Sequence, residues 1–208
     1  MISAQEALQR LREGNRRFVE NISDSGASLN HTRRFDLVRE QQRPFAIILG
    51  CSDSRVPAEI VFDQGLGDLF VVRVAGNVVA PSQIGSVEFA ATLYSTRLVV
   101  VMGHTQCGAI QATIDELRHP AKEQSRNLRS IVDFVRPSVE PLFHTELRHD
   151  HDALVRIAVR ANVGTSVSHL RHGSTILEQL IEKEGLRVVG AEYSLETGVV
   201  DFFSDAEV

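Results

Sequence analysis

Two cysteines and one histidine follow apolar stretches of the sequence, and side chains of these types could bind a metal. Cys51 comes after the run FAIILG at residues 45–50, while His104 and Cys107 follow the run that begins at Leu98. Each run has the length and β-branched content of a buried strand. Because open α/β sheets bind ligands at the carboxyl ends of their strands, we expect the two thiols and the imidazole to meet there and hold zinc.

A second interpretation is that Cys51 and Cys107 are buried free cysteines and that His104 is an ordinary core histidine. The spacing by itself does not separate the two interpretations. All three residues are predicted to lie in loops, where packing does not require cysteine or histidine, and this position favours a metal site. Three protein ligands leave one tetrahedral position for water, which is the arrangement of catalytic zinc.

Asp53 and Arg55 follow Cys51 closely and form a second candidate group. A forked pair between guanidinium and carboxylate would keep Asp53 ionised and oriented. The carboxylate could then accept a hydrogen bond from a zinc-bound hydroxide and leave a lone pair aimed at an electrophile. The alternative is a loop salt bridge that contributes little. The neighbouring cysteine favours the catalytic interpretation.

The elements around these residues alternate between predicted strands and helices, which is typical of a parallel sheet. The helix after HTQC directs its free amide hydrogens toward the site, and this field favours a thiolate. The expected fold class is α/β: a mostly parallel central sheet flanked by helices, with an N-terminal helical arm and a C-terminal helical region plus edge strand. Strands are predicted at 45–50, 68–75, 98–102, 186–194 and 198–203, and helices at 3–20, 33–41, near Pro57, 83–95, 106–117 and 174–183.

The flanking segments are predicted from caps and prolines. Ser3 is a candidate N-cap for the first helix, which we expect to precede the core rather than form it, and polar residues 20–30 are predicted to be a connection. Residues 118–172 have a helical pattern that we expect prolines to divide into several helices; these are Pro120, Pro137 and Pro141. Residues 1–208 are expected to form one domain, with an arm at 1–35, an α/β core at 45–117, and helices and closing strands at 118–208.

The composition excludes several classes of protein. The chain has 208 residues, of which 43% are hydrophobic and 24% charged, and a net charge of −5, so nucleic acid and anionic membranes are not expected as partners. It contains neither a signal peptide nor an apolar run of about 18 residues, which predicts a cytoplasmic protein without a membrane span. Two cysteines in a reducing compartment favour metal binding or catalysis over a structural disulfide.

The motifs CSDSR and HTQC together resemble the zinc signature of the β-class carbonic anhydrases. The similarity extends through VPAE, DLFVVRVAGN, IGSVEFA and LRVVGAEYSLETG, over about residues 40–203. It implies one zinc ion per subunit, held by Cys51, His104 and Cys107, and an Asp53–Arg55 dyad. The implied reaction is the reversible hydration of carbon dioxide to bicarbonate and a proton. The implied assembly is an obligate homodimer or a dimer of dimers, with an N-terminal helix that clasps the partner.

The same resemblance implies residues that bind the substrate. Gln42 matches a glutamine that hydrogen-bonds the substrate from across the dimer in plant-type members, and Gly108 follows the second cysteine. Phe70 and Phe89 match aromatic positions that line an apolar pocket suited to carbon dioxide. From the residues alone, both phenylalanines could equally be core.

One departure from the family concerns regulation. Some members bind bicarbonate in a non-catalytic pocket that uses a tryptophan, an arginine and a tyrosine. The corresponding residues here are Ile48, Arg73 and Tyr193, and the chain has no tryptophan. The sequence therefore predicts a plant-type enzyme with an open site and without this form of regulation.

Other signals are assigned to ordinary structure, and other functions stay open. The histidine-rich segment HTELRHDHD at 144–152 is interpreted as a solvated helix junction, and His169 and His172 as exposed helix residues. Carbon disulfide or carbonyl sulfide could be the electrophile instead of carbon dioxide. A non-enzymatic zinc scaffold would have a fourth protein ligand in place of water. A redox pair of Cys51 and Cys107 would require the two sulfurs to approach disulfide distance.

Overall fold

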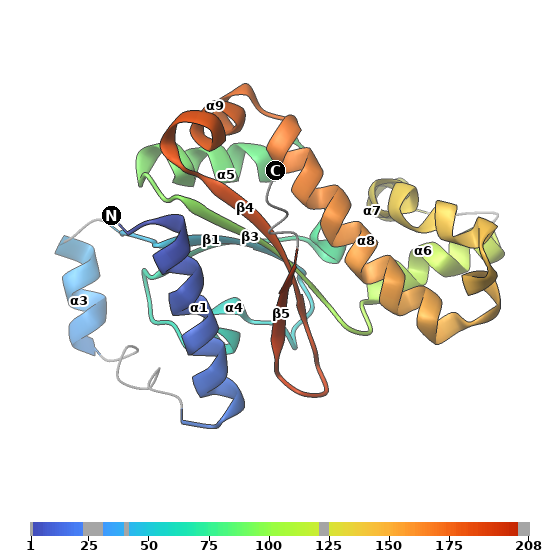
Figure 1. Ribbon diagram of the computed structural model, residues 1–208, viewed down its shortest axis with the longest axis horizontal. Coiled ribbons are helices and arrows are strands. Elements are labelled where there is room, and N and C mark those ends of the chain that lie inside the picture. Colours follow the sequence, from blue (N-terminus) through green and yellow to red (C-terminus); the bar gives the residue numbers. More distant parts are fainter. Residues whose placement is uncertain (1, 23–30, 40–41, 121–124, 204–208) are drawn as a thin grey trace.

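The computed structural model describes residues 2–22, 31–39, 42–120 and 125–203. Its centre is a five-stranded sheet in the order β2-β1-β3-β4-β5 (Figure 1). The first four strands in this order are parallel and β5 pairs antiparallel with β4, which confirms the mostly parallel α/β sheet with an edge strand. The strands are β1 (Ala46–Gly50), β2 (Leu69–Arg73), β3 (Leu98–His104), β4 (Arg187–Tyr193) and β5 (Val200–Phe203).

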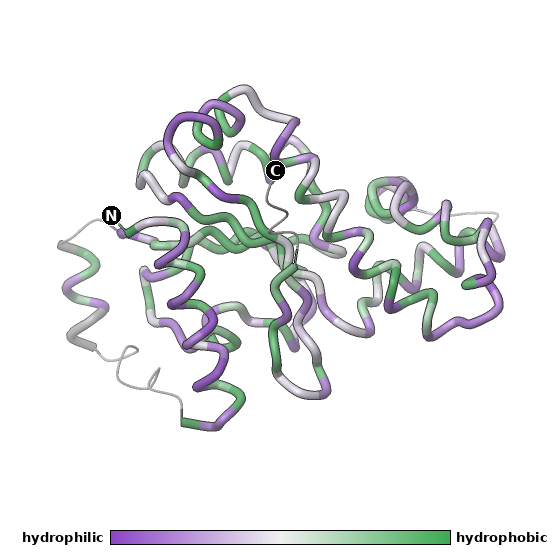
Figure 2. The backbone as a smooth tube through the Cα atoms, viewed as in Figure 1, coloured by the Kyte–Doolittle hydropathy of each residue, from purple (hydrophilic) through white to green (hydrophobic). Residues whose placement is uncertain are grey.

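The central strands are buried on both faces because helices cover the sheet from both sides (Figure 1). Every residue of β1 and β3 is buried, and the continuous apolar runs of both strands fit a parallel sheet with two covered faces (Figure 2). The sequence predicts a third strand that ends at Met102. In the structure β3 continues to His104, since Gly103 and His104 still pair with β4.

Helices occupy three places around the sheet (Figure 1). Helices α1 and α4 cover one face, and α5 and α9 cover the other, while α6 and α7 pack beside the amino-terminal half of α8. The α-helices are α1 (Ala4–Val19), α3 (His31–Arg39), α4 (Ala58–Val61), α5 (Pro81–Leu93), α6 (Gly108–Arg118), α7 (Arg126–Val139), α8 (His151–His172) and α9 (Thr175–Glu184). The 3₁₀ helices are η1 (Ala75–Asn77), η2 (Glu140–His144) and η3 (Glu146–His149).

Helix α1 begins as predicted but lies in the core. Ser3 caps it, and Glu6 completes a capping box by accepting from the backbone of Ser3. Leu8 and Leu11 are buried against the sheet in one cluster with Phe62. The expectation that this helix precedes the core is therefore wrong: its apolar stripe covers a sheet face that would otherwise be exposed. Residues 23–30 of the predicted connection lie outside the described residues.

The prolines between 118 and 172 do not all break helices. Pro120 follows the end of α6 and Pro141 stands at the start of η2, both as expected. Pro137 lies inside α7, so the prediction that it divides two helices is wrong. Because α7 ends at Val139, the ring interrupts only the last turn, where one missing amide hydrogen removes a single helical bond. No helix among the described residues has the length and apolar character to cross a bilayer.

Candidate active site

The topology places the candidate residues at the point where the strand order reverses. From β1, the chain adds β2 on one side and β3 on the other, so the carboxyl ends of β1 and β3 flank a crevice of the kind that holds ligands in open sheets. Cys51 follows the last residue of β1, and His104 is the last residue of β3. Cys107 is the N-cap of α6, which begins at Gly108.

Cys51, His104 and Cys107 form one buried cluster. Their two sulfurs and one ring nitrogen all lie within 4.8 Å of one another, and within the described residues this is the single group of histidine, cysteine and carboxylate side chains that could hold a metal. Both cysteines are free. Bonds of about 2.0–2.3 Å from a tetrahedral zinc would place such atoms roughly 3.5–4 Å apart. The upper bound of 4.8 Å on the separations therefore leaves the three atoms close enough to share one ion.

The orientation of His104 tests whether a metal fits. Its Nδ1 lies 2.8 Å from the carbonyl oxygen of Thr105, which can only accept, so Nδ1 carries a hydrogen and, in the neutral ring, Nε2 is the nitrogen with the lone pair. Nε2 is buried and has no hydrogen-bond partner within the described residues. A buried acceptor directed at two cysteine sulfurs fits a metal ligand whose tautomer is fixed by the other ring nitrogen.

The two thiols differ in their tendency to ionise. The hydrogen bond with Cys107 lowers the pKa of Cys51, and the same hydrogen bond together with burial raises the pKa of Cys107. The amide of Gly76 also donates to the Cys51 sulfur at 3.4 Å. Cys51 is therefore the more acidic thiol of the pair.

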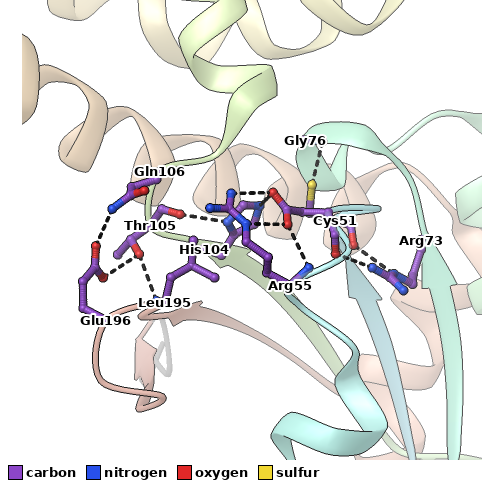
Figure 3. Close-up of polar contacts among 10 residues, drawn as sticks. Cys51, Arg55, Arg73, Gly76, His104, Thr105, Gln106, Leu195 and Glu196 are labelled. Carbon is purple, nitrogen blue, oxygen red and sulfur yellow. Dashed lines mark hydrogen bonds and ion pairs between the residues drawn. The ribbon is translucent and has the colours of Figure 1, made fainter.

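Asp53 and Arg55 form a forked pair beside this cluster (Figure 3). Arg55 donates from Nε to Oδ1 at 2.9 Å and from Nη2 to Oδ2 at 2.7 Å, and its backbone amide also donates to Oδ1 at 3.0 Å. These hydrogen bonds hold the pKa of Asp53 well below its usual range, so Asp53 is a carboxylate. Its Oδ2 lies 3.9 Å from Nε2 of His104, at the rim of the cluster.

Arg73 fixes the backbone of the loop after β1 (Figure 3). Its Nε donates to the carbonyl of Cys51 at 3.0 Å, and its Nη2 donates to that of Asp53 at 2.6 Å. Ile48 and Tyr193 correspond to the other two positions of the regulatory pocket found in some family members. Both side chains are buried here: Ile48 is wholly inaccessible and Tyr193 is 6% exposed. Arg73 is thus engaged with the loop that carries the dyad.

A second set of contacts holds the turn that donates to Cys51. Asn162 on α8 donates to the carbonyl of Gly76 at 2.8 Å, and Ser166 donates to that of Asn77 at 2.9 Å. Gly76 has φ of +69°, and a Cβ there would lie 3.0 Å from the Cβ of Ala109. The turn therefore needs glycine for its conformation and the α8 side chains for its position.

Three of the predicted substrate residues lie away from the cluster. Gln42 donates to the hydroxyl of Tyr94 at 2.8 Å, and the rings of Phe70 and Phe89 are 6.2 Å apart with Tyr94 beside both. Phe70 pairs with Ile47 near the amino end of β1, whereas Cys51 follows the carboxyl end. At about 3.3 Å per residue, the five residues of β1 span roughly 17 Å, and about this length of strand separates Phe70 and its neighbours from Cys51.

The fourth predicted substrate residue, Gly108, lies at the cluster. It adjoins Cys107 and is exposed.

Sequence reasoning missed the residues that support the cluster. The sequence points to Arg73 only through its match to a regulatory pocket of the family, and no motif surrounds Asn162 and Ser166. The position of Thr105 between two candidate ligands is the one local sign of a supporting role. The histidine-rich segment is spread over η2, η3 and the start of α8, and its histidines are exposed, which agrees with the interpretation of this segment as a solvated helix junction.

Comparisons with known proteins agree with this geometry. The family model described as carbonic anhydrase matches residues 46–200, so the chain belongs to the carbonic anhydrase family, and its fold is that of the β class. It is 38% identical to the carbonic anhydrase of Mycolicibacterium smegmatis over 200 residues, which cover 95% of this chain and 92% of that protein. It is 37% identical to carbonic anhydrase 2 of Mycobacterium tuberculosis over 195 residues, covering 92% and 89%.

A solved structure has the same architecture. The β-carbonic anhydrase CafA of the fungus Aspergillus fumigatus superimposes with a TM-score of 0.74 at 27% identity, covering 86% of this chain and 84% of that one. The protein is therefore a carbonic anhydrase, and the reaction of its family is the hydration of carbon dioxide.

Proposed function

We propose that this carbonic anhydrase works with one zinc ion per subunit, held by Cys51, His104 and Cys107, and interconverts carbon dioxide with bicarbonate and a proton. The observation that carries the proposal is the buried, unpartnered Nε2 of His104 beside two cysteine sulfurs. A zinc ion bound there would lower the pKa of a coordinated water and so supply hydroxide near neutral pH.

Asp53 would orient the attacking oxygen. As a carboxylate it can only accept hydrogen bonds, so it would bind the hydrogen of the nucleophile and leave an oxygen lone pair free for the carbon of the substrate. Arg55 holds both carboxylate oxygens and thereby fixes the direction of that acceptor. Arg73 would support the same step indirectly, because it fixes the loop carbonyls on either side of Ser52.

The substrate pocket would be completed by a second copy of the chain. Gln42, Phe70 and Phe89 lie at the end of β1 opposite the cluster, so they would serve the site of a partner subunit and not their own. Phe89 and Leu93 on α5 are 50% and 61% exposed, which suits an apolar interface. We therefore propose a homodimer, or a dimer of dimers, in which Gly108 and the partner's aromatic residues line the pocket.

The setting of the enzyme is part of the same proposal. A site built from two cysteines that are not joined in a disulfide is typical of a reducing compartment, which favours the cytoplasm. The net charge of −5 favours a small-molecule substrate over nucleic acid or an anionic membrane surface.

Zinc content and carbon dioxide hydration measured on one sample test the proposal. We expect one zinc per chain in the wild type, and loss of both zinc and hydration in H104Q. The matched control is H172Q, which changes an exposed histidine at the end of α8 and should retain both. A zinc-replete enzyme that turns over carbonyl sulfide but not carbon dioxide would overturn the proposed substrate. Full hydration activity in metal-free protein would overturn the zinc site.

A further inference from the structure

We propose that Glu196 is a positioning residue of the metal site, and that its carboxylate holds the loop between His104 and Cys107 in the conformation that presents both ligands. The inference rests on the proposed zinc site. It gives a role to the segment SLETG, residues 194–198, which connects β4 with β5.

Both oxygens of the Glu196 carboxylate contact this loop (Figure 3). Thr105 donates from Oγ1 to Oε2 at 2.8 Å, and Gln106 donates from Nε2 to Oε1 at 2.8 Å. Ser194 adds a third hydrogen bond to Oε2 at 3.1 Å. One carboxylate therefore holds both residues that separate the two candidate ligands.

The pairing of β3 with β4 brings Glu196 to this position. His104 pairs with Tyr193, and the amide of Thr105 donates to the carbonyl of Tyr193 at 3.0 Å. The turn that follows β4 therefore continues beside the loop that follows β3, and the amide of Leu195 donates to Oγ1 of Thr105 at 3.0 Å. The carbonyl of this same threonine orients the His104 ring. A shift of Thr105 would consequently turn the imidazole.

The loop needs such a support because its backbone is strained. Gln106 has φ of +56°, in the left-handed region that residues other than glycine rarely adopt. Its side chain is exposed and, together with Thr105 and Glu196, lines a cavity of about 470 Å³. Without the carboxylate, the loop could move into the adjoining cavity and so relieve the strain at Gln106.

The charge of Glu196 strengthens the contact. The hydrogen bond from Thr105, followed by those from the Glu196 backbone, Gln106 and Ser194, lowers the pKa of the carboxyl group, so it is ionised at neutral pH. Hydrogen bonds to an ionised acceptor are stronger than those between neutral groups.

The rate at which zinc leaves the loaded enzyme tests this role. Transfer of zinc to an excess of a chromogenic chelator would be followed near neutral pH, with circular dichroism showing that each variant remains folded. We expect E196A to release zinc about 10–100-fold faster than wild type, as is typical when a group that orients a ligand is removed. E196Q keeps one acceptor oxygen and should lie between the two. The control E182A removes an exposed carboxylate on α9 and should match wild type.

Two further measurements separate positioning from simple stabilisation. The visible absorption of the cobalt-substituted enzyme reports ligand geometry, and its bands should shift in E196A but not in E182A. Glycine adopts the backbone conformation of Gln106 without strain, so E196A should accelerate zinc release less in a Q106G background. A release rate for E196A within twofold of wild type, with unchanged cobalt bands, would overturn the role of Glu196. Wild type without stoichiometric zinc would overturn the proposed function as well.

Discussion

The guanidinium of Arg55 lies 2.9 Å and 2.7 Å from the two carboxylate oxygens of Asp53, and the same carboxylate lies 3.9 Å from Nε2 of His104. The side chain of Arg55 is 51% exposed, so the ion pair joins the protein surface to the rim of the buried cluster. Arg55 affects both the ionisation and the orientation of Asp53. The pH dependence of activity in a variant without Arg55 separates the two effects.

Replacing Arg55 by alanine should reduce activity by the same factor at neutral and alkaline pH. In wild type the pKa of Asp53 is lowered by Arg55, so R55A raises it toward the ordinary value of about 3.9. Asp53 remains ionised above pH 6 in both proteins, and only its orientation is lost. We expect kcat/KM for hydration to fall about 10–100-fold at every pH from about 6 to 9. R129A, which removes an arginine with a 67% exposed side chain on α7, serves as the control. Recovery of R55A at high pH would contradict this account.

Replacing Asn162 by alanine should destabilise the protein and weaken its hold on zinc. Asn162 is 2% exposed and donates to the carbonyl of Gly76, whose amide donates to Cys51. Leaving a buried carbonyl unpaired costs about 1–3 kcal/mol, which urea unfolding would measure. Zinc release should also accelerate in N162A. S168A on the exposed face of α8 should change neither quantity. An unaltered free energy of unfolding in N162A would rule out this support.

Alanine at Gly103 and at Gly164 should change stability in opposite directions. A Cβ at Gly103 would lie 2.7 Å from Cγ2 of Val163, which is fully buried and cannot move aside. We expect G103A to lower the free energy of unfolding by about 1–3 kcal/mol. A Cβ at Gly164, inside α8, meets nothing within 4 Å, so G164A should raise it by roughly 0.5–1 kcal/mol. Thermal unfolding of both variants would check the signs; equal signs would refute the packing argument.

A glutamate at position 93 should break the proposed homo-oligomer and reduce hydration. Leu93 is 61% exposed and lies one helical turn from Phe89 on α5. If the aromatic residues serve the site of a partner subunit, L93E should shift the protein toward smaller species in sedimentation velocity and lower kcat/KM in parallel. L128E changes a leucine of similar exposure, 64%, on α7 and should leave both unchanged. Full activity of L93E as a monomer would contradict the shared pocket.

Strands, caps and the order of the elements could be predicted because their signals are local. The apolar runs before Cys51 and His104 define β1 and β3, and Ser3 with Glu6 defines the start of α1. The effect of Pro137 could not be predicted, because it depends on how many helical hydrogen bonds follow the proline, and this number is set by the end of α7 at Val139. The burial of α1 against the sheet could not be predicted, because amphipathic spacing indicates that a helix has an apolar face but not which surface that face packs against.

The reactive groups of the site can be read from short segments of the chain: two thiols, one imidazole and an Asp-Arg pair, each at or just after the end of a strand. This is possible because residue types and strand ends are local properties. The groups that hold these residues in place come from distant parts of the chain and are visible only in the folded protein. Asn162 donates to the carbonyl of Gly76, Glu196 accepts from the loop between His104 and Cys107, and Gln42 donates to Tyr94 at the opposite end of β1 from Cys51. These relationships depend on strand order and helix packing, which join residues far apart in the chain and leave no local pattern.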